Sequence, residues 1–209
     1  GFPLHDVIDW VLSSAKDAAE KHAMTVKLIA SVNRPESAEL AEQVAWLAVD
    51  HVKDGLVALD LAGNEADFPS QPFYGIFKEA KQAGLHVTIH AGEWGPGYNV
   101  REAIEEIGAG IGKEVMPDGV RVMEDESIVA LARERQTAFE VCITSNYQSG
   151  VFESLETHPL MQMLEAGLNV TIRGSSSLPE PSPPSMFPSR PRNTSPPRVI
   201  RMWSPPRAA

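Results

Sequence analysis

The chain has 209 residues, of which 43% are apolar and 22% are charged, and its formal net charge is −10 at pH 7. This length is enough to bury a core, and the single cysteine, Cys142, excludes a small domain stapled by disulfides. The acidic excess argues against a nucleic-acid partner, since such proteins attract the phosphate backbone with Lys and Arg.

The sequence also argues against a membrane partner. No apolar run approaches the roughly 18 residues that a spanning helix needs, and no signal-peptide pattern is visible near the N-terminus. Together with the single cysteine, these features lead us to expect a cytoplasmic protein.

Two periodicities alternate along residues 1–172. Apolar side chains at helical spacing predict helices at about 4–20, 38–52, 72–83, 100–107 and 125–135. Short β-branched runs predict strands at 25–32, 56–62, 86–91, 138–144 and 168–172. This alternation predicts an α/β fold with a parallel sheet, because parallel neighbours need a crossover connection. The predicted strands are apolar on both faces, which suits an open doubly wound sheet as well as a closed barrel.

Residues 173–209 differ in composition from the predicted domain at 1–172. They contain ten of the 17 prolines, eight serines and six arginines, but one acidic residue. Such a segment has too few apolar residues to offset the entropy of ordering, so we predict a disordered C-terminal tail. A polyproline ligand for a recognition domain is the alternative interpretation. We favour the solvated extension and predict no defined protein partner.

Polar side chains gather at the predicted carboxyl ends of three strands. They lie in segments 60–65, 90–93 and 140–146. In both α/β architectures, the loops at that end of the sheet form the ligand site. We therefore predict that the three segments converge on one functional site.

His90 and Glu93 form the most specific pair in these segments. An imidazole at the end of an apolar strand, with a carboxylate three residues later, suits a metal ligand beside a general acid or base. His86 shares the strand but stands about 13 Å from His90 at roughly 3.3 Å per residue, so the two cannot bind one metal ion. The alternative interpretation is a hydrogen-bonded, partly buried histidine followed by an N-capping acid. The remaining histidines are interpreted as surface or packing residues in or beside helices: His5, His22, His51 and His158.

Four motifs, in this order and at this spacing, resemble the adenosine deaminase family. They are Asp-Leu-Ala-Gly-Asn-Glu at 60–65, Ile-His-Ala-Gly-Glu at 89–93, Glu-Val-Cys-Ile-Thr-Ser-Asn-Tyr-Gln-Ser-Gly at 140–150, and His-Pro at 158–159. Each motif alone is weak, but the combination is specific and covers about residues 1–172. The Ser-Asn-Tyr-Gln-Ser-Gly stretch favours adenosine deaminase over the related adenine and AMP deaminases.

The resemblance implies a partial TIM (β/α)8 barrel of the amidohydrolase type that lacks its first strand. It also implies hydrolytic deamination of adenosine or deoxyadenosine, a small-molecule purine nucleoside, to inosine or deoxyinosine and ammonia by a zinc-activated water. By the family's pattern, His90 would bind Zn2+ and Glu93 would protonate the purine nitrogen N1. Gly63, through its backbone, and Asp60 would bind the substrate. Zinc lowers the pKa of bound water to about 7, and an acid with a raised pKa can deliver the proton.

Three departures from the family's pattern predict that this chain alone is inactive. No His-x-His, which would give two zinc ligands, occurs in the sequence. Where the family has Ile-Gly-His-Gly, segment 111–121 places Lys113 or Asp118 at the histidine position, depending on the direction of counting. After Ile172 the chain reads Arg-Gly-Ser-Ser instead of Asn-Thr-Asp-Asp-Pro, which would supply another ligand. A catalytic zinc ion usually has three protein ligands, and one of the family's set is retained.

Two other functions stay open at this point. One is a non-catalytic purine-binding module, which the retention of Gly63, His90 and Glu93 favours. The other is a deaminase for a different aminopurine.

The predicted strands are too few to close an eight-stranded barrel. We therefore expect exposed sheet edges and an exposed apolar inner face. Aggregation or partner-dependent folding would follow.

Overall fold

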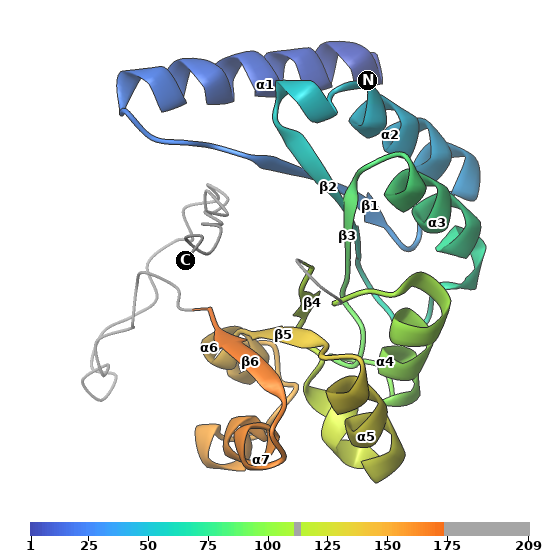
Figure 1. The fold of residues 1–209 in the computed structure, drawn as a ribbon, viewed down its shortest axis with the longest axis vertical. Coiled ribbons are helices and arrows are strands. Elements are labelled where there is room, and N and C mark those ends of the chain that lie inside the picture. The colour runs from blue at the N-terminus through green and yellow to red at the C-terminus, as the bar shows by residue number, and fades with distance from the viewer. Residues whose placement is uncertain (111–113, 174–209) are drawn as a thin grey trace, which may run out of the picture.

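The computed structural model describes residues 1–110 and 114–173. These residues form an α/β fold in which helices alternate with parallel strands (Figure 1). Apart from Arg173, the predicted tail at 173–209 lies outside the described residues.

Six strands and seven α-helices follow one another along the described residues. The strands are β1 (Leu28–Asn33), β2 (Leu56–Ala62), β3 (His86–Ile89), β4 (Met116–Pro117), β5 (Ala138–Val141) and β6 (Asn169–Ile172). The α-helices are α1 (Leu4–Lys21), α2 (Ala38–Asp50), α3 (Tyr74–Gln82), α4 (Tyr98–Glu102), α5 (Glu126–Glu134), α6 (Ile143–Gln148) and α7 (Leu160–Glu165). The shorter helical turns are η1 (Val52–Asp54), η2 (Gln71–Phe73), the π-helix η3 (Ala103–Ile107), η4 (Val120–Glu124) and η5 (Leu155–Thr157).

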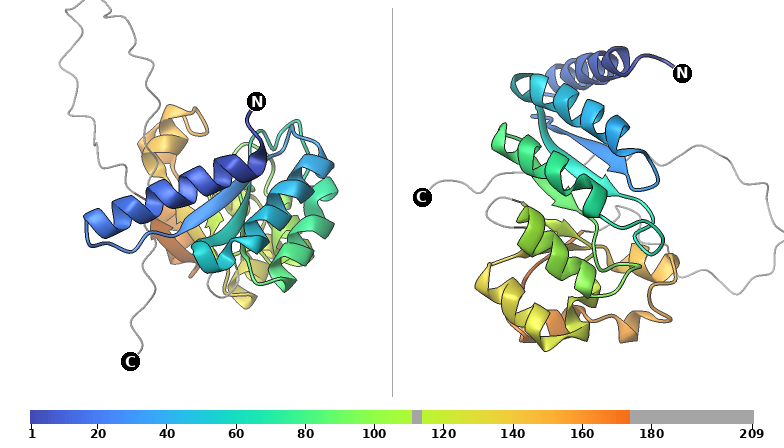
Figure 2. Two further views of the ribbon diagram at one scale, coloured as in Figure 1. Left: turned by 90° about the horizontal axis from the view of Figure 1, so that it is seen from above. Right: turned by 90° about the vertical axis from the view of Figure 1, so that its right-hand side faces the viewer.

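The strands lie in chain order as two parallel sheets of three, β1-β2-β3 and β4-β5-β6, and β4 lies next to β3. Helices α2, α3, α4 and α5 cover one side of this row, as Figure 2 shows from two further directions. Strands β1 and β6 have no partner on their outer sides among the described residues. The expected open edges are therefore present, and Ile172 on β6 is 61% exposed.

The core lies between the covering helices and the strands. Helix α2 begins at a Ser37 cap, whose hydroxyl accepts the backbone N–H of Leu40, and it buries alanines at 41, 45 and 48. Their spacing of four and three residues puts these small side chains on one helical face, which lets α2 lie close to the sheet. Phe77 on α3 is fully buried against the same core.

The structure confirms the five predicted helices and the five predicted strands, with several shifted boundaries. The strand predicted at 25–32 begins at Leu28, the strand predicted at 86–91 ends at Ile89, and the helix predicted at 100–107 is α4 followed by the π-helix η3. The strand predicted at 138–144 ends at Val141, and Ile143 and Thr144 belong to α6. The backbone N–H of Cys142 leaves the strand ladder and donates instead to the Asp118 carboxylate at 3.0 Å. This tertiary contact overrides the β propensity of the two residues that follow.

Among the described residues, none of the helices combines the length and the apolar composition that crossing a bilayer requires.

Replacing Phe77 with alanine tests the packing of the helical layer against the sheet. Phe77 is 0% exposed, and we expect Phe77→Ala to lower the free energy of unfolding by about 3–5 kcal/mol through a buried cavity. Phe68→Ala is the matched control, because that side chain is 38% exposed. Urea unfolding followed by circular dichroism measures both. Equal losses in the two variants would contradict the described core.

Candidate active site

Asp60 links three strands on one face of the sheet. Ser31, Asp60 and Thr88 are register partners across β1, β2 and β3, so their side chains point the same way. The Asp60 carboxylate accepts hydrogen bonds from the Ser31 hydroxyl at 3.2 Å and the Thr88 hydroxyl at 2.6 Å. His90 lies two residues beyond Thr88, and its Nδ1 is 3.2 Å from Asp60 Oδ1. Asp60 therefore orients the imidazole at the carboxyl end of β3.

Arg34 fixes the backbone of the same strand end. It follows β1, is 3% exposed, and donates from Nη2 to the His90 carbonyl at 2.7 Å and from Nη1 to the Phe68 carbonyl at 3.2 Å. Burial lowers the pKa of this guanidinium, while the Glu65 and Asp60 carboxylates act in the opposite direction. The His90 main chain is thus held by a buried cation, and its side chain by a buried anion.

Glu65 holds the loop that follows β3. Its two carboxylate oxygens accept the backbone N–H groups of Gly92 at 2.9 Å, Glu93 at 2.7 Å and Trp94 at 2.7 Å, and the Asn99 side-chain amide at 2.9 Å. Burial raises the pKa of Glu65, but these hydrogen bonds outweigh it and hold the pKa below its ordinary value. Glu65 is 5% exposed, so an ionised carboxylate at the base of the loop sets the loop's shape.

Glu93 projects from this loop into a half-buried position. Arg121 Nε donates to the Glu93 carbonyl at 3.1 Å, and the Asn146 amide donates to Glu93 Oε1 at 3.2 Å. Burial raises the pKa of Glu93 to about 7, with a further contribution from the Asp118 charge, while His90 and Asn146 act to lower it. Near neutral pH the carboxyl group is therefore present in both forms, as a proton donor requires.

Asp118 and Asn146 bring the β4 and β5 ends into the same site. Asp118 directly follows β4 and has a positive φ of 54°. Its Oδ1 accepts from the Cys142 backbone N–H and from the Asn146 amide at 3.2 Å. Of the two positions that the sequence offered for the family's histidine, Asp118 thus lies in the site, and Lys113 lies outside the described residues.

Two groups near the site were not assigned a role from the sequence. His158, interpreted as a surface or packing residue, is 9% exposed, and its Nε2 lies 3.2 Å from Asn146 Oδ1. The His-Pro motif was the available signal, but it did not indicate this contact. Cys142 has a pKa raised to about 12 by burial and by the Asp118 charge, so it is a thiol rather than a nucleophilic thiolate.

Gly63 follows β2 at a position that excludes a side chain. Its φ is 98°, and a Cβ would come within 2.6 Å of Asn33 Oδ1 and 3.2 Å of the Arg34 backbone nitrogen. The structure brings Gly63 and Asp60 to the end of β2, and His90 and Glu93 to the end of the adjacent β3.

The described residues do not by themselves fit a zinc site. No group of three or more His, Cys, Asp or Glu side chains in residues 1–110 and 114–173 is arranged to hold a metal ion. His86, at the start of β3, faces Glu114 at 3.9 Å and is separated from His90 by the length of the strand. His90 thus stands with Asp60 rather than within a set of three ligands.

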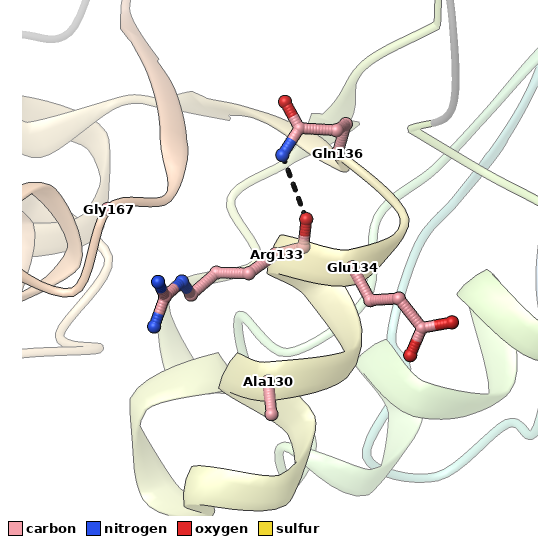
Figure 3. A pocket seen from close by; sticks show the side chains of 5 residues that line it. All are labelled: Ala130, Arg133, Glu134, Gln136 and Gly167. Atoms are coloured by element: carbon pink, nitrogen blue, oxygen red, sulfur yellow. Dashed lines mark hydrogen bonds between the residues drawn. The ribbon is translucent and has the colours of Figure 1, made fainter.

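A hollow lies near the amino ends of β5 and β6, away from the cluster around Glu93. Its lining comes from the end of α5 and from the turns before β5 and β6: Ala130, Arg133, Glu134, Gln136 and Gly167 (Figure 3). The Gln136 side-chain amide donates to the Arg133 carbonyl at 2.8 Å. In parallel α/β folds the ligand site lies at the carboxyl ends, so the cluster around Glu93 is the candidate active site.

Comparison with known proteins identifies the family. The family model described as adenosine deaminase matches residues 1–178. The chain belongs to the adenosine deaminase family. It is 36% identical over 168 residues to the adenosine deaminase of Klebsiella pneumoniae, covering 79% of this chain and 48% of that protein. It is 33% identical over 172 residues to the adenosine deaminase of Enterococcus faecalis, covering 82% and 50%.

Solved structures of the adenosine deaminase family and its neighbours agree on the fold. An adenine deaminase from Arthrobacter aurescens is 28% identical with a TM-score of 0.71, covering 82% of this chain and 51% of that one. A zinc-bound amidohydrolase from Burkholderia ambifaria is 23% identical with a TM-score of 0.73, covering 82% and 47%. The chain spans about half the length of the curated relatives it matches. Its fold is a partial (β/α)8 barrel of the amidohydrolase type.

Replacing Glu65 with glutamine tests the buried carboxylate under the loop. Glutamine has one acceptor oxygen, so two of the four N–H donors lose their partner. We expect the free energy of unfolding to fall by about 3 kcal/mol at neutral pH. Because the folded pKa of Glu65 is lowered, its stabilisation is present above the ordinary pKa and disappears as the pH falls through the folded value.

The difference in free energy of unfolding between wild type and Glu65→Gln should therefore decrease as the pH is lowered from 6 to 3.5. Urea unfolding across this range measures it, with Glu79→Gln, an exposed acid on α3, as the control. A constant difference across the range would argue against an ionised Glu65.

Proposed function

We propose that this chain forms the proton-donating part of a deaminase site for 6-aminopurine nucleosides such as adenosine and deoxyadenosine. The observation that carries the proposal is Glu93, held at the end of β3 with a pKa of about 7, in a member of the adenosine deaminase family. Hydrolysis joins the oxygen of water to C6 of the purine, releases the amino group as ammonia and leaves inosine or deoxyinosine.

Glu93 supplies the proton in this scheme. As the water oxygen bonds to C6, the ring loses aromaticity and negative charge develops on N1. A neutral Glu93 carboxyl transfers its proton to N1 and becomes a carboxylate. Burial and the Asp118 charge keep the proton on Glu93 until substrate arrives, which is the environment that a catalytic acid needs.

Gly63 and Asp60 are proposed to shape the purine site in different ways. Gly63 offers its backbone at the end of β2, where its positive φ and the close approach of Asn33 and Arg34 require a residue without a side chain. Asp60 is 3% exposed and is already engaged by Ser31 and Thr88, so we assign it an indirect role through His90.

His90 is the residue that we assign to a zinc ion in the completed site. A catalytic zinc ion usually takes three protein ligands, and the described residues place no such set around His90. We therefore propose that these 209 residues bind a purine nucleoside but do not turn it over alone.

Adenosine binding tests the role of Glu93. If a neutral Glu93 donates to N1, affinity should fall by about tenfold per pH unit above the Glu93 pKa of about 7. Glu93→Gln, which always carries an N–H donor, should give a flat profile. Isothermal calorimetry between pH 5.5 and 8.5, with Glu79→Gln as the exposed control, measures this. Equal pH profiles for wild type and Glu93→Gln would refute the assignment.

Zinc binding and turnover test the claim of inactivity. In equilibrium dialysis with equimolar zinc, we expect substoichiometric binding to the full chain, and a further decrease in His90→Gln. With adenosine and zinc, inosine should not form above the rate seen with Glu93→Gln. Stoichiometric zinc together with Glu93-dependent inosine formation would contradict the claim.

A non-catalytic purine-binding module is the second candidate function. The observation that favours it is the contact between Glu93 and buried Asn146, together with the lack of a set of three metal ligands in residues 1–110 and 114–173. Calorimetry with adenosine and inosine in the absence of zinc separates the two. A deaminase acid should prefer adenosine, since inosine already carries a proton on N1, whereas a module without that chemistry need not discriminate.

A further inference from the structure

Asn146 and His158 form a buried chain of hydrogen bonds that ends on Glu93. Asn146, on α6, is 0% exposed, and His158 stands between η5 and α7 with its ring 5.0 Å from that of Phe152. The two residues come from sequence motifs to which the proposed chemistry gives no role.

The direction of this chain is set at its far end. The backbone N–H of Leu160 donates to His158 Nδ1 at 3.1 Å, so Nδ1 is the unprotonated nitrogen of the ring. In the neutral imidazole, Nε2 then carries the hydrogen and donates to Asn146 Oδ1 at 3.2 Å. Asp118 is the charged group that faces His158, and burial lowers the His158 pKa despite that charge, which supports the neutral ring.

The orientation of the Asn146 amide follows from this donor. With Oδ1 turned toward His158, Nδ2 faces the carboxylates, and its two hydrogens reach Glu93 Oε1 and Asp118 Oδ1, each at 3.2 Å. The reversed amide would point a carbonyl oxygen at both carboxylates, which repels them unless one is protonated. The state of His158 therefore decides which atom of Asn146 meets the acid.

We propose that His158 is a positioning residue for Glu93, acting through Asn146. The Glu93 backbone is already fixed by Glu65 and Arg121, and Asn146 fixes the carboxyl group itself. Since Asn146 engages Oε1, the geometry assigns Oε2 as the oxygen that carries the transferable proton. This assignment rests on the proposed role of Glu93 as the acid.

Two substitutions at position 158 separate positioning from simple helix capping. The side-chain oxygen of asparagine lies near the place of histidine Nδ1, so His158→Asn keeps the acceptor for Leu160 and removes the donor to Asn146. The side-chain nitrogen of glutamine lies near the place of Nε2, so His158→Gln keeps the donor and removes the acceptor. If His158 only caps α7, the asparagine variant is the milder one. If it positions Glu93, the glutamine variant is the milder one.

The test combines NMR of the full chain with nucleoside binding. In wild type, nitrogen-15 shifts should show the Nε2–H tautomer of His158, and the carbon-13 resonance of the Glu93 carboxyl should titrate near 7. In His158→Asn the midpoint should rise by about 0.5–1 unit, because Glu93 loses an N–H donor. At pH 6, where Glu93 is mostly neutral in both proteins, adenosine affinity should fall by up to about tenfold, in line with the loss of one hydrogen bond that orients the carboxyl group. His158→Gln should stay within about twofold of wild type.

Three results would overturn the proposal. They are an Nδ1–H tautomer in wild type, an unchanged Glu93 midpoint in His158→Asn, and equal effects of the two variants. The tautomer of His158 is measured on the wild-type protein, so this part of the test does not depend on whether His158→Asn folds. The resonances of His158 and Glu93 are measured on the protein without nucleoside, so they test the positioning role independently of binding. If the wild-type protein failed to bind adenosine, that result would refute the proposed function instead.

Discussion

The site depends on one buried carboxylate. Glu65 collects the backbone N–H groups of three consecutive residues and the Asn99 amide, and these bonds join the end of β2 to the loop after β3. A buried charge is stable only when it is well hydrogen-bonded, and one of these bonds holds the backbone N–H of Glu93. The acid can be half-buried with a raised pKa because a neighbouring acid, fully satisfied, holds its backbone in place.

The parts of this arrangement that are local in sequence could be predicted. The strand ends, and the pair His90 and Glu93, follow from periodicity and a spacing of three residues. Asn146 lies 53 residues from Glu93, and its role depends on an amide orientation set by His158. Such a network exists only after the strands have been placed side by side, so no spacing rule reveals it. Strand β4, with two residues, is likewise too short to carry a period of its own.

The sequence left open whether Lys113 or Asp118 stands where the family has a histidine, and Asp118 lies in the site. Its Oδ1 receives N–H groups from both Cys142 and Asn146. A neutral imidazole has one acceptor lone pair and could not take both, so the network is matched to a carboxylate at this position. With Glu65, Glu93 and Asp118 close together, the site carries several carboxylates, which favours a proton on the member that accepts the fewest hydrogen bonds. Glu65 accepts four and Asp118 two, whereas the Glu93 carboxyl group accepts one, from Asn146. The unusual residue after β4 thus helps to keep Glu93 protonated.

The shifted pKa values of the same groups limit the pH range in which the site is stable. Glu93 has a raised folded pKa, so its contribution to stability is present below its ordinary value near 4.5 and is lost as the pH rises through about 7. Glu65 and His158 have lowered folded pKa values, so their contributions are present above the ordinary values and are lost as the pH falls. For His158 that loss begins near pH 6.5. The acid form of Glu93 and the neutral form of His158 therefore coexist just below pH 7, because burial raises the pKa of the acid and lowers the pKa of the imidazole.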